Sequence, residues 1–235
     1  MQIDTKEVLR YLAFRGEPEE RLLQEIDICS RELLSTVMPK SCFLRVPVVH
    51  GENGQLEIAG TSLCSKDLQG HLRECTEAFL FAATLGAQAD SLMRRYSVTT
   101  MSRAVILQAC AAAAIESFCD EQEEELRKSV EEEKLFLRPR YSPGYGDFPI
   151  QWQHTLLSML DAPKRIGLTA TESCMLAPTK SVTAIIGLTH DETDCHIRKC
   201  MGCKSKNCPF RRDGDDPAGD TRESVAEREN YPSRR

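Results

Sequence analysis

Apolar residues recur at helical spacing early in the chain and change to strand spacing directly afterwards. From Glu19 to Val37 a single apolar stripe predicts an amphipathic helix, which Pro39 ends. The next stretch, "CFLRVPVV", predicts a strand in which Pro47 indicates an edge or a bulge. After the turn "GENG", the segment "QLEIAG" predicts the return strand of a hairpin.

The middle of the chain predicts two buried elements. A short polar helix over Ser65–Cys75 is followed by "AFLFAATLG", which is typical of a buried strand. A longer helix is expected from Met101 to about Lys134. Its first half, "AVILQACAAAAIESFC", is rich in small residues that let a neighbouring element approach closely. Its second half, including Asp120–Glu125, is expected to face solvent.

The loop "RPRYSPGYGDFPIQWQ" comes next, and we expect Trp152 to pack beneath it. A short helix near Pro149–Leu160 follows. The apolar runs "RIGLTATES" and "SVTAIIGLT" then predict two strands joined by a loop. Helices and strands that do not alternate regularly predict an α+β fold, with a mixed or antiparallel twisted sheet and flanking helices.

The periodic apolar pattern stops after Thr189, and this change sets the expected domain boundaries. We expect one folded domain over residues 1–190 and a cysteine-rich loop over residues 191–211. Residues 212–235 are polar and of mixed charge, so we expect a disordered tail.

Composition narrows the class of protein. The chain has 235 residues, 41% of them hydrophobic and 28% charged, as in ordinary globular proteins. Its net charge of -6 argues against a general nucleic-acid binder, which needs a basic face. No uninterrupted apolar run approaches the roughly 18 residues of a membrane span. The N-terminus lacks the pattern of a secretion signal, so we expect a cytoplasmic protein with no membrane partner.

The loop around Gly144 has the groups that an amino-acid-like ligand with a positive centre and an aromatic base would need. Pro143 and Gly144 favour a tight turn, over which a flat ligand can approach the backbone. Arg140 offers a planar fork of donors for a carboxylate. Tyr141 and Tyr145 offer π faces and hydroxyl groups. The same composition also fits an ordered connection whose tyrosines pack into the core.

Two stretches of this sequence, "RYSPGYGDFPIQWQ" and "KRIGLTATESCMLAPTKSVTAIIGL", resemble the activation domain of cobalamin-dependent methionine synthase. In that family an Arg-x-x-Pro-Gly-Tyr segment lines the S-adenosylmethionine site, and a Thr-Glu-Ser strand end follows it. The resemblance covers roughly Glu7 to Thr189. It implies a cofactor site formed here by Arg140, Tyr141, Ser142, Pro143, Gly144, Tyr145 and Glu172. The family also implies an acidic contact on the small-residue helix, where Ala112 stands and Glu116 lies one turn further on.

The resemblance implies a role in reactivation. Methionine synthase cycles its cobalamin through cobalt(I), which is occasionally oxidised to inert cobalt(II). Rescue takes one electron and the methyl group of S-adenosylmethionine. Arg140 would pair with the methionine carboxylate, while the backbone at Ser142 and the Tyr145 side chain would place the rest. The sequence shows no corrinoid-binding module, so the implied partners are a separate cobalamin-binding synthase or related corrinoid protein and an electron donor. This chain would be one component of the synthase's methyltransferase activity.

The C-terminal part holds a second candidate site. Among eleven cysteines, four form a Cys-x4-Cys-x2-Cys-x4-Cys run: Cys195, Cys200, Cys203 and Cys208. Thiols this close in a reducing compartment favour a metal site. Zinc would hold together a loop that has no core, whereas an iron–sulfur cluster would carry an electron. The sequence does not decide between zinc and an iron–sulfur cluster. Two other functions also remain compatible with the sequence. One is an iron–sulfur electron carrier for a corrinoid methyltransferase, and the other is a zinc-stabilised interaction module without chemistry of its own.

Overall fold

The computed structural model describes residues 1–193 and residue 195. Its helices and strands follow one another in this order: α1 (Thr5–Tyr11), α2 (Glu20–Thr36), β1 (Lys40–His50), β2 (Gln55–Ile58), β3 (Thr61–Cys64), α3 (Lys66–His71), β4 (Glu77–Thr84), α4 (Ala87–Thr99), α5 (Met101–Ser129), the 3-10 turn η1 (Glu131–Glu133), β5 (Phe136–Leu137), α6 (Trp152–Met159), α7 (Ala162–Ile166), β6 (Thr169–Ala170), β7 (Leu176–Ala177) and β8 (Ser181–Thr189).

A six-stranded sheet in the order β3-β2-β1-β4-β8-β5 forms the centre of the protein. Every pairing in it is antiparallel, which confirms the predicted α+β fold. β4 lies between β1 and β8 and is buried over nearly its whole length. Pro47 is the last residue of β1 that pairs with β4, and the pairing with β2 begins at Val48. The proline therefore stands where the strand changes partner.

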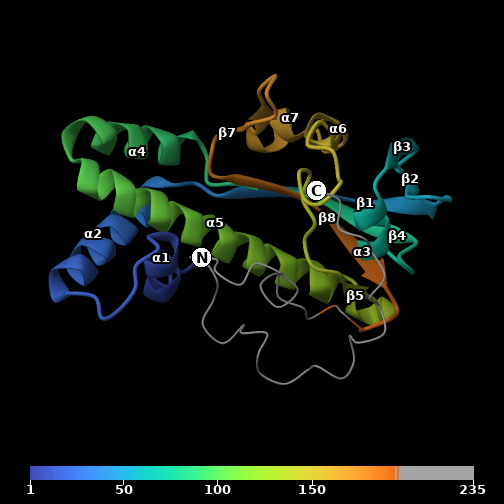
Figure 1. The fold of residues 1–235 in the computed structure, drawn as a ribbon, viewed down its shortest axis with the longest axis horizontal. Coiled ribbons are helices and arrows are strands. Elements are labelled where there is room, and N and C mark those ends of the chain that lie inside the picture. The colour runs from blue at the N-terminus through green and yellow to red at the C-terminus, as the bar shows by residue number, and fades with distance from the viewer. Residues whose placement is uncertain (194, 196–235) are drawn as a thin grey trace, which may run out of the picture.

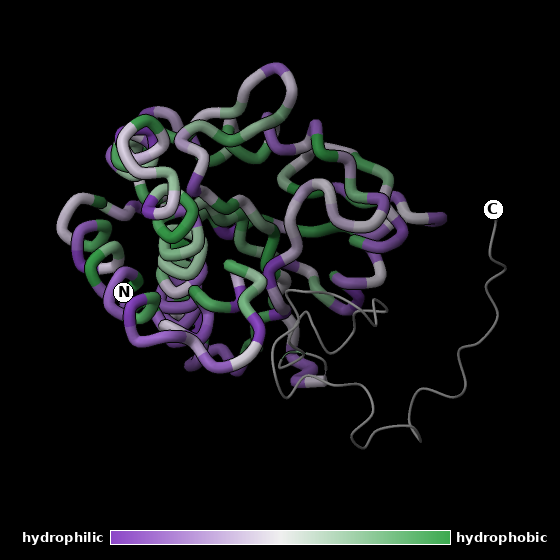
Figure 2. The backbone as a smooth tube through the Cα atoms, turned by 60° about the vertical axis from the view of Figure 1, so that its left-hand side comes forward, coloured by the Kyte–Doolittle hydropathy of each residue, from purple (hydrophilic) through white to green (hydrophobic). Residues whose placement is uncertain are grey.

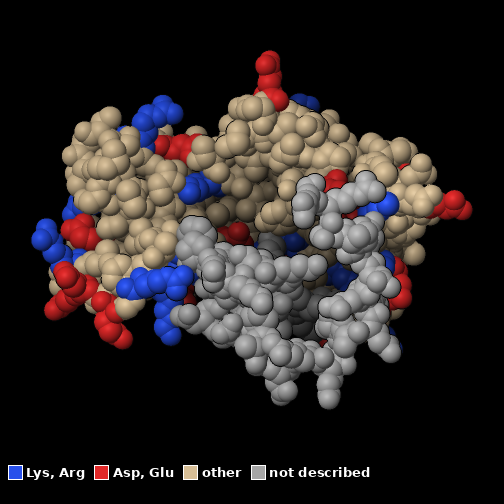
Figure 3. Space-filling model, in the orientation of Figure 1, with Lys and Arg blue, Asp and Glu red and all other residues tan. Residues whose placement is uncertain are grey.

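The two faces of the sheet carry two separate cores. In Figure 1, α1, α2 and α5 lie on one side of the sheet, and α6 and α7 lie on the other. The first core packs the small residues of α5 against β4 and β8, and the second packs α3, α6 and α7 against the opposite face. Charged side chains gather over α1 and α2, at the left of Figure 3, while the surface over α6 and α7 shows few.

The long helix α5 has two halves of different character. Its first half is buried through alanines and other small residues, and its second half carries the charges. The tube of α5 in Figure 2 accordingly passes from green and white to purple. An 18-residue stretch of α5 is apolar enough to cross a membrane, but 56% of it is buried inside the protein. It is the central helix of the first core.

One predicted strand is wrong. The segment expected to be a strand over residues 165–173 instead ends α7 and contributes only Thr169–Ala170 as β6. Pro163 stands in the first turn of α7, and Gly167 ends the helix in the left-handed conformation. A short apolar run is compatible with a helix or a strand, and here Pro163 and Gly167 are the signals that mark a helix.

Candidate functional site

The candidate loop begins as an extension of the sheet edge, and a bulge changes its register. Leu137 pairs with Leu188, and Tyr141 forms a bridge with Ile185. The chain therefore advances four residues while β8 advances three, which leaves one extra residue between the pairs. Such a β-bulge reverses the side-chain alternation beyond it. Pro139, which has no N–H to donate, lies inside the bulge.

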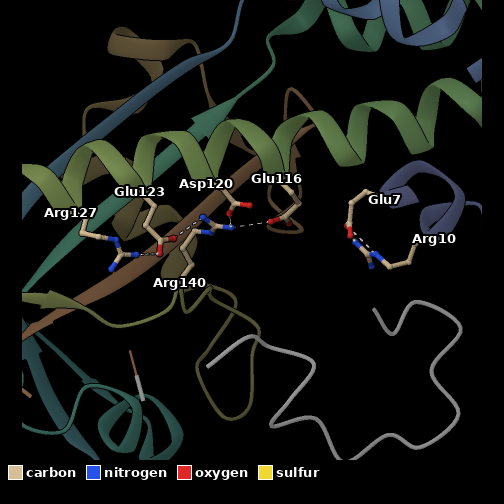
Figure 4. Close-up of polar contacts among 7 residues, drawn as sticks. All are labelled: Glu7, Arg10, Glu116, Asp120, Glu123, Arg127 and Arg140. Atoms are coloured by element: carbon tan, nitrogen blue, oxygen red, sulfur yellow. Dashed lines mark hydrogen bonds and ion pairs between the residues drawn. The ribbon is translucent and has the colours of Figure 1, made fainter. Parts of the chain in front are cut away.

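Because of the bulge, Arg140 points to the α5 side of the sheet while Tyr141 packs on the other side. The Arg140 guanidinium is bound by three carboxylates that α5 presents along one stripe (Figure 4). The N–O distances are 3.1 Å to Glu116, 2.6 Å to Asp120 and 2.8 Å to Glu123. Glu123 also pairs with Arg127 at 3.5 Å, which extends the row along the helix (Figure 4).

The Arg140 side chain is only 9% exposed. Burial by itself would lower the pKa of Arg140, but the neighbouring carboxylates of Glu123 and Asp120 raise that pKa above its ordinary value. Arg140 therefore stays charged, and its charge is compensated inside the protein.

Two of these carboxylates form part of the wall of an open groove of about 940 Å³ between α5 and the N-terminal segment. The N-terminal ammonium group pairs with Glu121 at 2.6 Å, and Gln2 N donates to Ser117 Oγ at 3.3 Å. The lining is strongly acidic and has one lysine: Gln2, Ile3, Asp4, Thr5, Glu7, Ala113, Glu116, Ser117, Asp120, Glu121, Glu124, Glu125 and Lys128. A ligand with positive centres suits such a groove.

The aromatic half of the loop packs against the second core. Tyr141 lies 4.7 Å from His71, 5.9 Å from Tyr145 and 6.3 Å from Phe148, measured between ring centroids. Phe148 in turn contacts Trp152 at 5.7 Å, so Trp152 does pack beneath the loop. Tyr145 is 45% exposed and presents its ring at the surface.

A carboxylate fixes the far end of the loop to the N-terminus of α3. Asp147 accepts hydrogen bonds from the Ser65 hydroxyl and from the backbone N–H groups of Lys66 and Asp67. These donors lower the pKa of Asp147. Gly146 has φ +53°, and a Cβ there would lie 2.2 Å from Asp67 Oδ2. The loop therefore needs glycine at this position to come so close to α3.

The turn of the loop itself is tight, as its sequence predicts. Gly144 has φ +93°, and its N–H donates to Phe148 O at 2.9 Å. Tyr145 N donates to Ser142 O at 3.1 Å across Pro143. The turn is thus closed by its own backbone.

Glu172 lies apart from the contacts that hold Arg140. It stands in the turn between β6 and β7, on the side of the sheet that carries α6. This turn is tied to α6, because Gln153 Nε2 donates to Cys174 O at 3.1 Å. The structure therefore brings Arg140 and Glu116 together, and groups Tyr141 with Tyr145, but its contacts join Glu172 to neither set.

Of the four predicted metal ligands, only Cys195 falls within the described residues; Cys200, Cys203 and Cys208 lie outside them, as does the predicted tail. Cys195 is 6% exposed, and its thiol donates to Asp191 O at 3.3 Å. Burial raises the pKa of Cys195, and Arg138 opposes that rise. In the described part of the chain, no group of three or more His, Cys, Asp and Glu side chains is arranged to hold a metal ion.

Sequence reasoning missed three residues that the structure makes prominent. Asp120 and Glu123 were expected on a solvated helix face, yet both bind Arg140. Their spacing from Glu116, at i+4 and i+7 on one helix face, was the available signal. Arg138 was not singled out, although it is the largest fully buried side chain among the described residues.

Fold and site define a class of protein: an α+β domain with an antiparallel sheet, whose edge carries an arginine held by carboxylates of the longest helix. The sequence matches the family model described as vitamin B12 dependent methionine synthase, activation domain, over residues 60–202. The match spans more than half of the chain, and the chain belongs to that family.

A solved structure agrees with this assignment. The fold is similar to the crystal structure of the MetH reactivation domain bound to AdoHcy, with a TM-score of 0.62 and 17% sequence identity. The similarity covers 81% of this chain and 75% of that one. At this identity the likeness establishes the fold. None of the curated proteins matches the sequence.

Proposed function

We propose that this chain binds S-adenosylmethionine and supports the reductive methylation of cobalamin held by a separate cobalamin-dependent methionine synthase. Membership in the activation-domain family supports the role, and the similar reactivation domain was crystallised with AdoHcy, the demethylated form of that ligand. The observation that carries the proposal is the acidic groove on α5, with Arg140 bound at its wall.

The groove fits the charge of the ligand. S-adenosylmethionine carries a sulfonium and an ammonium centre against a single carboxylate, so a predominantly acidic lining favours it. A volume of about 940 Å³ suffices for a nucleoside with an amino-acid arm. Glu116 would bind a positive centre or a ribose hydroxyl, in the way that acidic residues bind ribose in nucleotide sites.

Arg140 has a positioning role in this proposal. Its guanidinium holds Glu116 and Asp120 at the groove wall and offers a donor fork to the ligand carboxylate, which would replace one of them. Tyr145 packs against Tyr141 and does not line this groove, so it has no part in this binding mode. Bound S-adenosylmethionine supplies an electrophilic methyl group, and the residues of this chain bind and orient it.

The remaining partners follow from the chemistry. Cobalt(II) needs one electron before it can accept a methyl group, so an electron donor takes part alongside the corrinoid protein. We place the reaction in the cytoplasm, where the synthase would meet both. The chain acts in trans in this proposal.

Calorimetry with S-adenosylmethionine tests the binding step. Glu116→Gln keeps the shape of the side chain and removes its charge, so the dissociation constant should rise about 10- to 100-fold, the range for a lost charged hydrogen bond. Asp27→Asn on α2, which alters an exposed pair with Arg31, is the matched control and should bind as the parent does. Unchanged affinity in Glu116→Gln would place the ligand elsewhere.

A trans-reactivation assay tests the rest. The chain is mixed with a cobalamin-dependent synthase held in the cobalt(II) state, a reductant and S-adenosylmethionine, and the absorbance of methylcobalamin is followed. Methylation should depend on the added chain and should fall in Glu116→Gln. Methylation at the same rate without the chain would refute the proposed role.

A further inference from the structure

The bulge that carries Arg140 is fixed at both ends by backbone hydrogen bonds to β8. Arg138 N donates to a carbonyl of β8 at 2.8 Å, and Tyr141 N donates to another at 2.9 Å. Among the described residues, these ladder contacts skip Pro139 and Arg140, which lie between them. The Pro139 carbonyl therefore needs a hydrogen-bond donor from outside the sheet.

His71, the last residue of α3, supplies that donor. Its half-buried ring places Nε2 2.8 Å from Pro139 O. A carbonyl oxygen only accepts hydrogen bonds, so Nε2 carries a proton and donates it. The His71 ring also lies against the Tyr141 ring, with 4.7 Å between the centroids and 34° between the planes. His71 therefore contacts the residue before Arg140 and the residue after it.

The packing of α3 brings His71 to this place. Leu68 within α3 and Leu72 directly after it are fully buried in the second core. Gly187 of β8 allows their close approach, because a Cβ there would lie 2.8 Å from Leu72 Cδ2 and 3.2 Å from Arg138 Cγ. A glycine in the strand thus lets the end of α3 come close to β8 where the bulge begins.

This geometry gives His71 control over the direction of the Arg140 side chain. The Pro139 carbonyl and the Arg140 N–H belong to one planar peptide unit. A hydrogen bond that fixes the carbonyl therefore fixes the plane from which the Arg140 side chain starts. The ring contact keeps Tyr141 on the α3 side, and side-chain alternation then sends Arg140 to the α5 side. There its guanidinium group lies 2.6 to 3.1 Å from carboxylates of α5.

We propose that His71 is a positioning residue for the ligand carboxylate and acts through Arg140. This inference rests on the proposed function, in which Arg140 offers its donor fork to the carboxylate of S-adenosylmethionine. Such a two-pronged contact tolerates little displacement, because both N–H groups must point at carboxylate oxygens. His71 does not itself line the groove. It determines how strongly the site prefers a ligand that carries a carboxylate.

Two substitutions separate the two contacts of His71. His71→Phe keeps a ring against Tyr141 and removes the donor, whereas His71→Gln keeps an N–H donor for Pro139 O and removes the ring. The matched control is His50→Phe. The Nε2 atom of His50 also lies close to a backbone carbonyl oxygen, at 2.9 Å, but this carbonyl belongs to Cys75, outside the bulge.

Calorimetry compares S-adenosylmethionine with its decarboxylated form, which lacks only the carboxylate. In His71→Phe the dissociation constant for S-adenosylmethionine should rise about 5- to 10-fold, the range for one lost hydrogen bond, and that for the decarboxylated form should stay within about 2-fold. His71→Gln should recover most of the affinity, and His50→Phe should bind both ligands as the parent does. Equal losses for both ligands in His71→Phe would show a structural role only and would overturn the proposal, as would unchanged binding of both.

A double-mutant cycle provides a test without ligand. If the parent chain binds neither ligand, the proposed function fails, and the cycle of His71→Phe with Arg140→Ala decides whether His71 positions Arg140. The double variant should lose less stability than the sum of the single losses, because the hydrogen bond of His71 supports the ion pairs of Arg140. The cycle of His50→Phe with Arg140→Ala should be additive. Additive losses in both cycles would overturn the proposal.

Discussion

Arg138 and Arg140, which are separated by Pro139, are both buried but differ in how many partners their guanidinium groups have. Arg140 is 9% exposed and pairs with three carboxylates of α5, so its charge is fully compensated within the described protein. Arg138 is 2% exposed and has two nitrogen atoms without a hydrogen-bond partner among the described residues. The same residue type, two positions apart, is therefore paired with three carboxylates in one case and only partly paired in the other.

The difference originates in the backbone. Without the bulge, strand alternation would direct residues 138 and 140 to the same face. The extra residue sends Arg140 to the acidic stripe of α5 and leaves Arg138 facing Cys75 and Leu72. One inserted residue thus separates the arginine at the candidate ligand site from the arginine buried on the other face of the sheet.

The largest effect is expected from removing the compensated cation. Arg140→Ala leaves Glu116, Asp120 and Glu123 close together without a counter-charge, so the free energy of unfolding should fall by about 3 kcal/mol. The Asp120 side chain is 61% exposed, and solvent screening of its charge makes the loss smaller than for a fully buried group. Urea denaturation followed by circular dichroism measures it.

Arg31→Ala is the control for that measurement. Arg31 pairs with Asp27 on the surface of α2, where both side chains are largely exposed, so its loss should cost less than about 0.5 kcal/mol. Similar losses in both variants would mean that the carboxylates of α5 do not depend on Arg140.

The sequence predicted the family and the longest elements, but it predicted neither α4 nor this division of the site. Helical and strand spacing identified α2, β1, β4 and most of α5, because each carries a long apolar pattern. The bulge leaves no such pattern: it depends on how Tyr141 pairs with Ile185, which is a tertiary contact. The predicted site therefore treated Arg140 and Tyr141 as neighbours around one ligand, whereas they project to different faces.

The burial of Arg138 could not be read from composition either. An arginine next to a proline in a loop is normally exposed. The only signal was Gly187, a glycine within the apolar run "AIIGL", since glycine in a strand marks a close approach by another group. In the structure, the groups that approach Gly187 are the side chains of Cys75 and Arg138, which both pack against β8.

A medium effect is expected from filling the slot at Gly187 of β8, in which the stem of the Arg138 side chain lies. In Gly187→Ala the new Cβ meets Cys75 Sγ at 2.7 Å and Leu72 Cδ2 at 2.8 Å, so the free energy of unfolding should fall by about 2 kcal/mol. Cys75→Ala removes one of the two clashes, and the double variant should therefore lose less than the sum of the single losses. Strict additivity in this cycle would show that the slot adjusts elsewhere.

The smallest effect is expected beyond the bulge, where Asp147 holds the loop on α3. Asp147→Asn removes the charge that caps the N-terminus of α3, so the free energy of unfolding at pH 7 should fall by about 1 kcal/mol. The pKa of Asp147 is lowered below 3.8 in the folded protein. Its contribution is therefore complete well above 3.8, the ordinary pKa of an aspartate, and is lost as the pH falls through the folded pKa.

The difference in stability between the parent chain and Asp147→Asn should accordingly be constant above about pH 5 and shrink below about pH 4. Denaturation at a series of pH values measures this difference. The contributions of the other carboxyl groups cancel in it because both proteins contain them. In the double variant Arg140→Ala/Asp147→Asn the two losses of stability should add, since Asp147 contacts α3 and Arg140 contacts α5. A strong coupling would mean that the Asp147 anchor, and not the bulge at Pro139, directs Arg140 toward α5.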